Sequence, residues 1–300
     1  MRNKLGKYLV DYASKDEKLR LLVGDIGFGI FDEFIEKHPE KFINCGIAEQ
    51  NMIGTAAGLA DNGFHVVVYT IIPFLVYRPF DFIRNLIAHQ NIPVCLIGVG
   101  GGFSYDTLGF THYAKEDLTL ISSLPNFKIY TPFDPKSAVS CFDTAFDFKS
   151  PTYIRLMKGG EPDISVIKNE DGFSILNNFG NDFLIITHGS IAINASIAAI
   201  ELSVKRNINC KVIAIWDIDK LNTIIKNVSC KILIIEEHNA PGIFLTKLIE
   251  ENQTISNSIY TMFTDRNTNQ LVATREDILK QQNLDSESIV NKILNIVKNK

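Results

Sequence analysis

The chain has 300 residues, of which 46% are hydrophobic and 21% are charged, and its formal net charge is −4. This composition is typical of a globular protein that is long enough for two domains. The charge argues against a nucleic-acid-binding or membrane-surface protein, and no apolar run approaches the roughly 18 residues of a membrane span.

The five cysteines include no C-x-x-C pair, and most of them lie in apolar runs such as residues 93–97. We therefore expect reduced core cysteines and no zinc site, as in a cytoplasmic protein. The N-terminal residues 1–5 are followed by charged residues and not by the apolar core of a secretory signal. This pattern also favours a cytoplasmic location.

Short β-rich runs alternate with amphipathic segments in the first half of the chain. We expect strands at 21–23, 66–69, 94–99, 127–130 and 152–155, and helices at roughly 2–15, 48–62, 73–89 and 135–148. This alternation predicts a mostly parallel sheet with helices on both faces.

A polar stretch at 158–172 contains Gly159, Gly160 and Pro162 and is typical of a linker. A second α/β unit follows, with apolar runs at 183–187, 212–216, 232–235 and 259–263 and an amphipathic stretch at 190–205. The predicted fold class is α/β, with two mostly parallel-sheet domains. We expect domains at 1–157 and 176–300, joined by a linker at 158–175.

Residues 44–52 read NCGIAEQNM, and they place Glu49 at the start of an Ala- and Gly-rich helix. A carboxylate in the first turn interacts favourably with the helix dipole, so a plain capping acid is one interpretation. Taken alone, the position favours that capping interpretation; a functional role for Glu49 depends on the resemblance described below.

Residues 73–80 read PFLVYRPF, with Phe74, Tyr77 and Phe80 spaced every three residues after a predicted strand. This spacing places the three aromatic side chains on one side of a helix. Core packing is the simpler interpretation, and we favour it for Phe80.

A long loop at 98–112 begins with a run of glycines and ends in Gly109-Phe110-Thr111-His112. It has neither the G-x-G-x-x-G fingerprint nor the lysine and hydroxyl residues of a phosphate-binding P-loop. A histidine on a loop at the carboxyl end of a strand is well placed for proton transfer, although many such residues are only polar surface groups.

Taken together, these segments resemble the transketolase family, including its relative deoxyxylulose phosphate synthase. Residues 46–52 resemble its G-x-x-E-x-x-M motif, residues 73–80 its T-F-x-x-F-x-x-Y run, and residues 109–112 the end of its D-G-P-T-H motif. The resemblance implies the pyrimidine-binding domain and the C-terminal domain of a thiamine-diphosphate enzyme.

The resemblance also implies roles for individual residues. Glu49 would bind the aminopyrimidine ring of thiamine diphosphate, where a carboxyl that shares its proton favours the imino tautomer that deprotonates the thiazolium C2. A half-buried glutamate with a raised pKa would suit that role. Phe74, Tyr77 and Phe80 would line the pyrimidine pocket, and His112 would exchange protons with sugar hydroxyls.

Two further residues match the family less specifically. Asp25 follows the first strand, where the family has an aspartate near the cofactor and the subunit interface; a turn aspartate is the alternative. Arg155 matches an arginine that contacts the acceptor's phosphate, although an interdomain salt bridge is nearly as good an interpretation. Residues 236–239 (EEHN) resemble a structural or interface turn of the C-terminal domain.

The chain also departs from the family. Leu108 and Phe110 replace the motif's acid and proline, and a glycine run stands where transketolases commonly have a histidine. These groups help to select the sugar, so ordinary pentose phosphate specificity is in doubt. No G-D-G motif followed by a metal-binding asparagine is present.

We therefore expect a separate chain to bind Mg²⁺ and the diphosphate, in an assembly with two copies of each chain. The predicted function is ketol transfer between sugar substrates. The alternatives are the beta subunit of a 2-oxo acid dehydrogenase, an acyloin-forming synthase, or a non-catalytic partner subunit.

Overall fold

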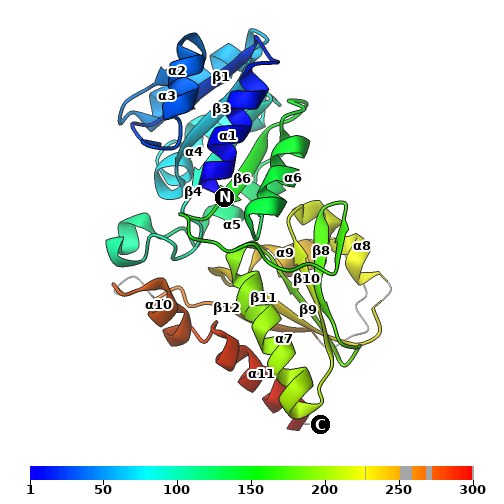
Figure 1. Ribbon diagram of the computed structural model, residues 1–300. Coiled ribbons are helices and arrows are strands. Elements are labelled where there is room, and N and C mark those ends of the chain that lie inside the picture. Colours follow the sequence, from blue (N-terminus) through cyan, green and yellow to red (C-terminus); the bar gives the residue numbers. More distant parts are fainter. Residues whose placement is uncertain (227, 251–258, 268–271, 299–300) are drawn as a thin grey trace.

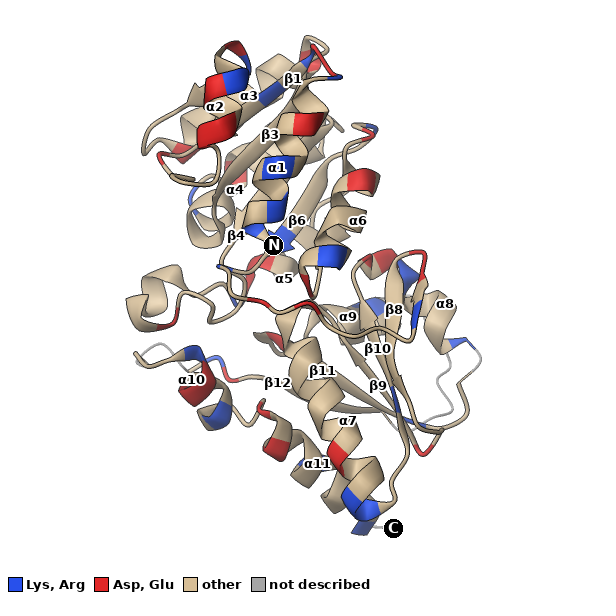
Figure 2. Cartoon of the chain, in the orientation of Figure 1, with Lys and Arg blue, Asp and Glu red and all other residues tan. Residues whose placement is uncertain are grey.

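The computed structural model describes residues 1–226, 228–250, 259–267 and 272–298. Each half of the chain forms one six-stranded sheet covered by helices, and the two halves stack end to end (Figure 1). The predicted α/β class with two mostly parallel sheets is therefore confirmed. Acidic and basic residues are interspersed over the helices of both halves (Figure 2).

The first sheet is entirely parallel and has the strand order β2-β1-β3-β4-β6-β5. Its strands are β1 (Leu19–Val23), β2 (Phe42–Asn44), β3 (His65–Ile71), β4 (Val94–Val99), β5 (Lys128–Tyr130) and β6 (Thr152–Leu156). The central strands β3, β4 and β6 are buried almost throughout, as the continuous apolar runs of a two-sided sheet predict.

Helices cover both faces of this sheet. One face packs against α1 (Arg2–Ala13), α2 (Asp32–Lys37) and α6 (Pro135–Ala145). The other packs against α3 (Glu49–Asp61), α5 (Asp117–Ser122) and the helical stretch 73–88. A capping box starts α6: Ser137 N donates to Asp134 Oδ1 (2.7 Å), and Asp134 N donates to Ser137 Oγ (3.0 Å).

The stretch 73–88 differs from the single helix expected there. Residues Pro73–Tyr77 and Ile83–Ala88 are π-helical, and only α4 (Phe80–Phe82) between them is α-helical. Pro79 interrupts the stretch because its nitrogen carries no hydrogen for the ladder. Wide turns of this kind are frequent at functional sites.

The second sheet has the order β12-β11-β9-β10-β8-β7. Its strands are β7 (Lys168–Glu170), β8 (Phe173–Asn178), β9 (Phe183–Thr187), β10 (Cys210–Ile215), β11 (Lys231–Asn239) and β12 (Ile259–Thr264). Helices α7 (Ala192–Arg206) and α11 (Ser286–Lys298) cover one face, α8 (Leu221–Ile225) and α9 (Ile243–Glu250) cover the other, and α10 (Arg275–Gln281) precedes α11.

The expected linker at 158–175 is wrong in its second part. Residues 168–170 form β7, which pairs antiparallel with β8, and β8 pairs antiparallel with β10. Edge strands expose polar side chains, so β7 shows no apolar alternation from which it could be predicted. We propose that the boundary between the two domains lies in the extended stretch between β6 and β7.

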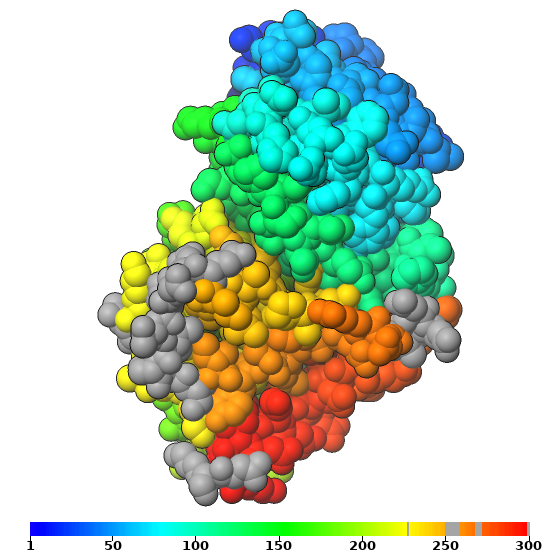
Figure 3. Space-filling model, turned by 180° about the vertical axis from the view of Figure 1, so that it is seen from behind, coloured from blue at the N-terminus to red at the C-terminus, as the bar shows by residue number. Residues whose placement is uncertain are grey.

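The two domains share their cores. Each of the two large apolar clusters contains residues from both sheets, and Thr131 N donates to Trp216 O (2.8 Å) across the junction. The view from behind shows the two halves packed directly on one another (Figure 3). Among the described residues, no helix is both long and apolar enough to span a membrane.

Candidate active site

The predicted site residues gather at one edge of the first sheet. In the parallel register, Val23 of β1 lies beside Asn44 of β2, and Ile71 of β3 lies beside Val99 of β4, so the carboxyl ends of these strands lie at one edge of the sheet. Ligands of open parallel sheets bind at this carboxyl edge. The segments with Asp25, Glu49, the aromatic run and His112 all begin there.

Glu49 is the first residue of α3, and only 5% of it is exposed. As the acid in the first turn of α3, Glu49 is placed to interact favourably with the helix dipole, but its carboxylate makes no capping hydrogen bond to the backbone of the described residues. Glu49 Oε1 instead accepts a hydrogen bond from Arg78 Nη1 at 2.9 Å. The ion pair with Arg78 is compatible with the capping interpretation and adds a contact that capping does not require.

The aromatic run and the loop before α5 enclose a hollow of about 290 Å³. It is lined by Pro73, Phe74, Tyr77, Arg78, Phe110, Thr111, Tyr113, Lys115 and Glu116. Most of the wall is aromatic or aliphatic, while Arg78, Lys115 and Glu116 add charge. A hollow of this kind suits a flat ring with a polar edge.

His112 lies beside this hollow. Its ring centroid is 5.3 Å from that of Phe74, in an edge-to-face arrangement, and its Nδ1 is 3.0 Å from Thr111 Oγ1. Partial burial lowers the pKa of His112, and the positive charges of Arg78 and Lys158 lower it further. The imidazole is thus held as the neutral form, which can accept a proton at neutral pH.

The aromatic residues divide between two environments. Tyr77 lines the hollow, and its hydroxyl donates to Glu116 Oε2 at 2.9 Å. Burial, followed by the charges of Asp117 and Glu116, raises the pKa of Tyr77 far above its usual range, so the hydroxyl stays protonated. Phe80 packs against the apolar cluster beneath α3, which agrees with the core interpretation favoured for it.

Asp25 stands apart on the exposed rim of the same edge. Its backbone is left-handed (φ 53°), and its carboxylate accepts from Asn44 Nδ2 at 3.2 Å. Asn44 Oδ1 accepts in turn from the backbone nitrogens of Asp25 and Gly46. These hydrogen bonds between Asp25, Asn44 and Gly46 stabilise the turn that leads to Glu49. Within this chain, the contacts of Asp25 are those of a turn aspartate.

Arg155 lies inside the junction of the two domains, where only 2% of it is exposed. Its Nε donates to Asp117 Oδ2 (2.9 Å), and its Nη2 donates to the carbonyls of Ala114 (2.8 Å) and Glu237 (3.2 Å). These contacts favour a structural role over contact with a substrate phosphate. The ion pair joins β6 to α5 within the first domain and is not the interdomain salt bridge that was expected, whereas the hydrogen bond to the Glu237 carbonyl crosses to the second domain.

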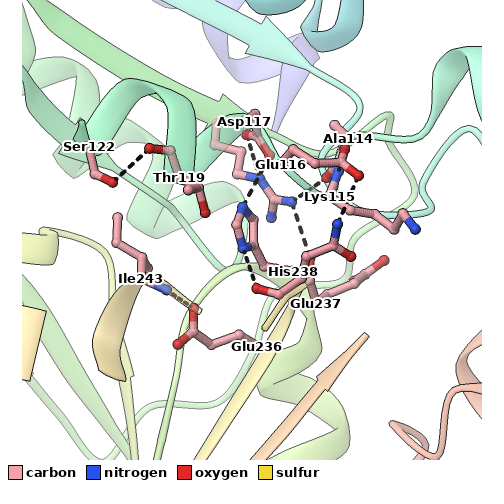
Figure 4. A network of polar contacts seen from close by, with 12 residues as sticks. Ala114, Lys115, Glu116, Asp117, Thr119, Ser122, Glu236, Glu237, His238 and Ile243 are labelled. Atoms are coloured by element: carbon pink, nitrogen blue, oxygen red, sulfur yellow. Dashed lines mark hydrogen bonds and ion pairs between the residues drawn. The ribbon is translucent and has the colours of Figure 1, made fainter. Parts of the chain in front are cut away.

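Figure 4 shows the polar network around Asp117, with residues from the loop before α5, from α5, from β11 and from the start of α9. Tyr153 donates to Asp117 Oδ2 (2.7 Å), and His238 Nε2 lies 4.0 Å from Asp117 Oδ1. Below them, Glu236 accepts from Ile243 N (2.9 Å) and Phe244 N (3.1 Å) at the start of α9. Burial lowers the pKa of His238, and the charge of Arg155 lowers it further, whereas the carboxylates of Asp117 and Glu236 oppose that shift.

The glycine run at 100–102 packs closely against residues at the junction of the two domains. A Cβ on Gly101 would lie 2.9 Å from Arg155 Cζ, and a Cβ on Gly102 would lie 2.3 Å from Glu237 Oε1. Phe103 N donates to the same Glu237 oxygen (2.8 Å). The glycines let the loop approach the second domain closely, which agrees with their lack of a phosphate-binding pattern.

Sequence reasoning missed Arg78, Glu116, Lys115 and Asp117 as residues of this region. Arg78 and Glu116 could have been found, since one lies inside the aromatic run and the other lies four residues after His112. Within the described residues, no group of three or more His, Cys, Asp or Glu side chains is arranged to hold a metal ion.

Comparison with known families and proteins agrees with this geometry. Residues 1–161 match the family described as "Transketolase, pyrimidine binding domain". A transketolase C-terminal section from Methanocaldococcus jannaschii is 27% identical, with 99% of this chain and 96% of the relative covered. A subunit of the apulose-4-phosphate transketolase from Actinobacillus succinogenes is 32% identical over 70% of this chain and 69% of the relative.

A solved structure titled "Split gene transketolase, inactive beta4 tetramer" has a TM-score of 0.82 and 26% identity. The match covers 98% of this chain and 96% of that one. A transketolase from Campylobacter jejuni has the same fold, with a TM-score of 0.82 at 18% identity, and this chain spans 46% of its length.

Proposed function

Because this chain belongs to the transketolase family, we propose that it is one subunit of a two-chain enzyme that transfers a two-carbon ketol unit between sugar substrates, with thiamine diphosphate as cofactor. The observation that carries the proposal is the buried Glu49 carboxylate at the start of α3, next to an aromatic hollow at the carboxyl edge of the sheet. An acid and a flat apolar wall are what the aminopyrimidine ring requires.

Each residue of the site has a role in the proposal. Bound thiamine diphosphate supplies a nucleophilic thiazolium carbon. Glu49 shares a proton with the pyrimidine ring nitrogen, while Phe74 and Tyr77 flank the ring and exclude water. His112, neutral at the mouth of the hollow, accepts a proton from a sugar hydroxyl and returns it. Phe80 supports the wall from the core side.

We propose that the partner chain holds Mg²⁺ and the diphosphate. The match of this chain to a transketolase C-terminal section and to a transketolase subunit of similar length supports the split. Large apolar side chains also stand exposed at the edge where the partner would dock: Phe28 is 80% exposed and Ile47 is 78% exposed. Exposed apolar groups beside a site are typical of an interface, and we propose two copies of each chain in the assembly, with Asp25 at the subunit contact.

The substrate is a sugar or sugar phosphate that differs from the usual pentose phosphates. Leu108 and Phe110 take the places of the family's acid and proline, and they are 52% and 55% exposed beside His112. All five cysteines are free, which supports a reducing, cytoplasmic setting.

Calorimetry tests whether the cofactor site is shared between this chain and its partner. We expect little binding of thiamine diphosphate to the purified chain, and tight, Mg²⁺-dependent binding once the partner is added. The solved split-gene relative is titled as inactive in its beta4 form, which supports this expectation. Tight binding by this chain alone would refute the split site.

A second candidate is an acyloin-forming synthase. A 1-deoxy-D-xylulose-5-phosphate synthase from Clostridium perfringens is 28% identical over 97% of this chain, which spans 48% of that protein. The product distinguishes the two candidates. Release of carbon dioxide from a 2-oxo acid would favour the synthase, or the beta subunit of a 2-oxo acid dehydrogenase, and ketol transfer without it would favour the transketolase.

A further inference from the structure

Arg78 contacts two residues of the proposed cofactor site at the same time. Its Nη1 donates to Glu49 Oε1 at 2.9 Å, and its Cζ lies 4.0 Å from the centroid of the Phe74 ring. Its side chain is 48% exposed, whereas that of Glu49 is 6% exposed. Arg78 is therefore a guanidinium held between the buried carboxylate and the aromatic wall, with one side open to solvent.

Arg78 lies at a break in the helical stretch, next to the hollow. Arg78 directly follows the π-helical residues Pro73–Tyr77 and directly precedes Pro79, where φ is −97° and ψ is 21°. Arg78 lines the hollow, while Glu49 is absent from the lining residues. The guanidinium thus stands between the hollow and the carboxylate.

A guanidinium and an aminopyrimidine compete for the same two contacts. Both are flat, both stack on an aromatic face, and both present N–H groups or a ring nitrogen to a carboxylate. Phe74 offers one face at stacking distance to Arg78, and Glu49 offers it one oxygen. A ring that stacks on that face and bonds to that oxygen requires Arg78 to leave.

We propose that Arg78 is a positioning residue that closes the cofactor site until the aminopyrimidine ring displaces it; this inference rests on the proposed function. In the free chain Arg78 keeps the buried Glu49 carboxylate paired and covers Phe74. In the assembled enzyme, the partner's hold on the diphosphate supplies the free energy that displaces the guanidinium. Arg78 therefore makes cofactor binding depend on assembly.

The first test measures cofactor binding in the reconstituted complex by calorimetry and stopped flow. Arg78→Gln should bind thiamine diphosphate about five- to thirty-fold more tightly and faster, since one ion pair and one cation–π contact no longer compete. Arg78→Lys keeps the charge but loses the planar group, so its affinity for thiamine diphosphate should lie between those of the wild type and Arg78→Gln. Arg84→Gln removes an exposed positive charge six residues away and should bind like the wild type.

The outcomes separate the two proposals. Unchanged or weaker binding in Arg78→Gln, with normal wild-type binding, would refute the closing role alone. A wild-type complex that binds no thiamine diphosphate would refute the proposed function and the closing role together. An arginine with only a structural role would lower the melting temperature without tightening binding.

A second test uses the isolated chain and needs no cofactor. Melting curves of Arg78→Gln, Glu49→Gln and the double variant form a double-mutant cycle for the ion pair. We expect the second substitution to lower the melting temperature less than it does in the wild type, because the pair is already broken. Fully additive effects would show that the pair is absent from the free chain and would overturn the inference.

Discussion

Two arginine–carboxylate pairs in this protein have the same length and opposite surroundings. Arg155 Nε lies 2.9 Å from Asp117 Oδ2, with side chains 2% and 0% exposed. Arg78 Nη1 lies 2.9 Å from Glu49 Oε1, with side chains 48% and 6% exposed. The N–O distance is the same in both pairs and does not distinguish them. The exposure of the arginine side chain does, because Arg78 is half exposed and Arg155 is buried.

The difference shows which polar groups are available for chemistry. The Arg155 pair is enclosed by Tyr153, His238 and backbone carbonyls, so no surface remains for a ligand. The Arg78 pair adjoins a hollow on one side. The closed pair joins β6 to α5 within the first domain, and removing one partner costs several kcal/mol. An open pair can exchange its cation for a ligand at small cost.

The sharpest test of the open pair is Glu49→Gln. Glutamine keeps the shape but cannot share a proton with the pyrimidine ring, and loss of a positioned acid–base group costs about 10²–10⁴-fold in rate. We expect hydrogen–deuterium exchange at the thiazolium C2 of the reconstituted complex to slow by that factor, while the melting temperature falls only by the small amount that loss of the half-exposed ion pair with Arg78 causes. Glu33→Gln, at the exposed start of α2, is the matched control.

If the thiazolium C2 exchanged at the wild-type rate in Glu49→Gln, the contrast between the Arg78 and Arg155 pairs would have no catalytic significance. Glu49 would then be a structural acid like Asp117, and this chain would be a non-catalytic partner subunit.

The closed pair is tested by Asp117→Asn. This change leaves the buried Arg155 charge without its anion, which costs about 3–5 kcal/mol of unfolding free energy. Urea unfolding of the isolated chain measures it. Glu33→Gln, which removes the exposed partner of Lys37, should leave the midpoint nearly unchanged. A loss of unfolding free energy below about 1 kcal/mol would mean that the buried Arg155 charge does not depend on Asp117 for compensation.

The closed region should also respond to pH through His238. Burial lowers its pKa in the folded chain, with Arg155 and His188 adding to this effect and Asp117 and Glu236 opposing it. The unfolded chain therefore takes up this proton first as the pH falls below about 6.5, and stability declines by up to about 1.4 kcal/mol per pH unit in that window. The decline should be smaller in His238→Gln, and an equal decline would contradict this assignment.

Sequence reasoning identified the open region better than the closed one. Glu49, Phe74, Tyr77 and His112 lie in short motifs with local spacing, and the structure brings all but Tyr77 into direct contact with one another or with Arg78; Tyr77 lines the same hollow. Their catalytic and binding roles remain predictions.

The closed network depends on contacts between residues far apart in the chain. Arg155 meets Asp117 at a separation of 38 residues and Glu237 at 82, and no local pattern encodes such pairs. The same holds for β7, whose place is set by its partner strand. Arg78 was missed for another reason: it lies inside the aromatic run, where sequence reasoning considered only the aromatic side chains.

The smallest expected effect separates the two regions within one experiment. Partial burial lowers the pKa of His112, and the charge of Arg78 contributes to that shift. Removing the charge in Arg78→Gln makes the protonated imidazole less unfavourable, so the pKa of His112 should rise toward its ordinary value. The pKa of His238 should not move, because its cationic neighbour is Arg155. NMR titration of the imidazole signals in the isolated chain measures both pKa values, with Arg84→Gln as the control for lost charge.

If Arg78→Gln left the pKa of His112 unchanged, the guanidinium would not lie beside the hollow in solution. If it moved both histidines, the open and closed regions would be one coupled network, and the contrast between the two arginine pairs would not hold.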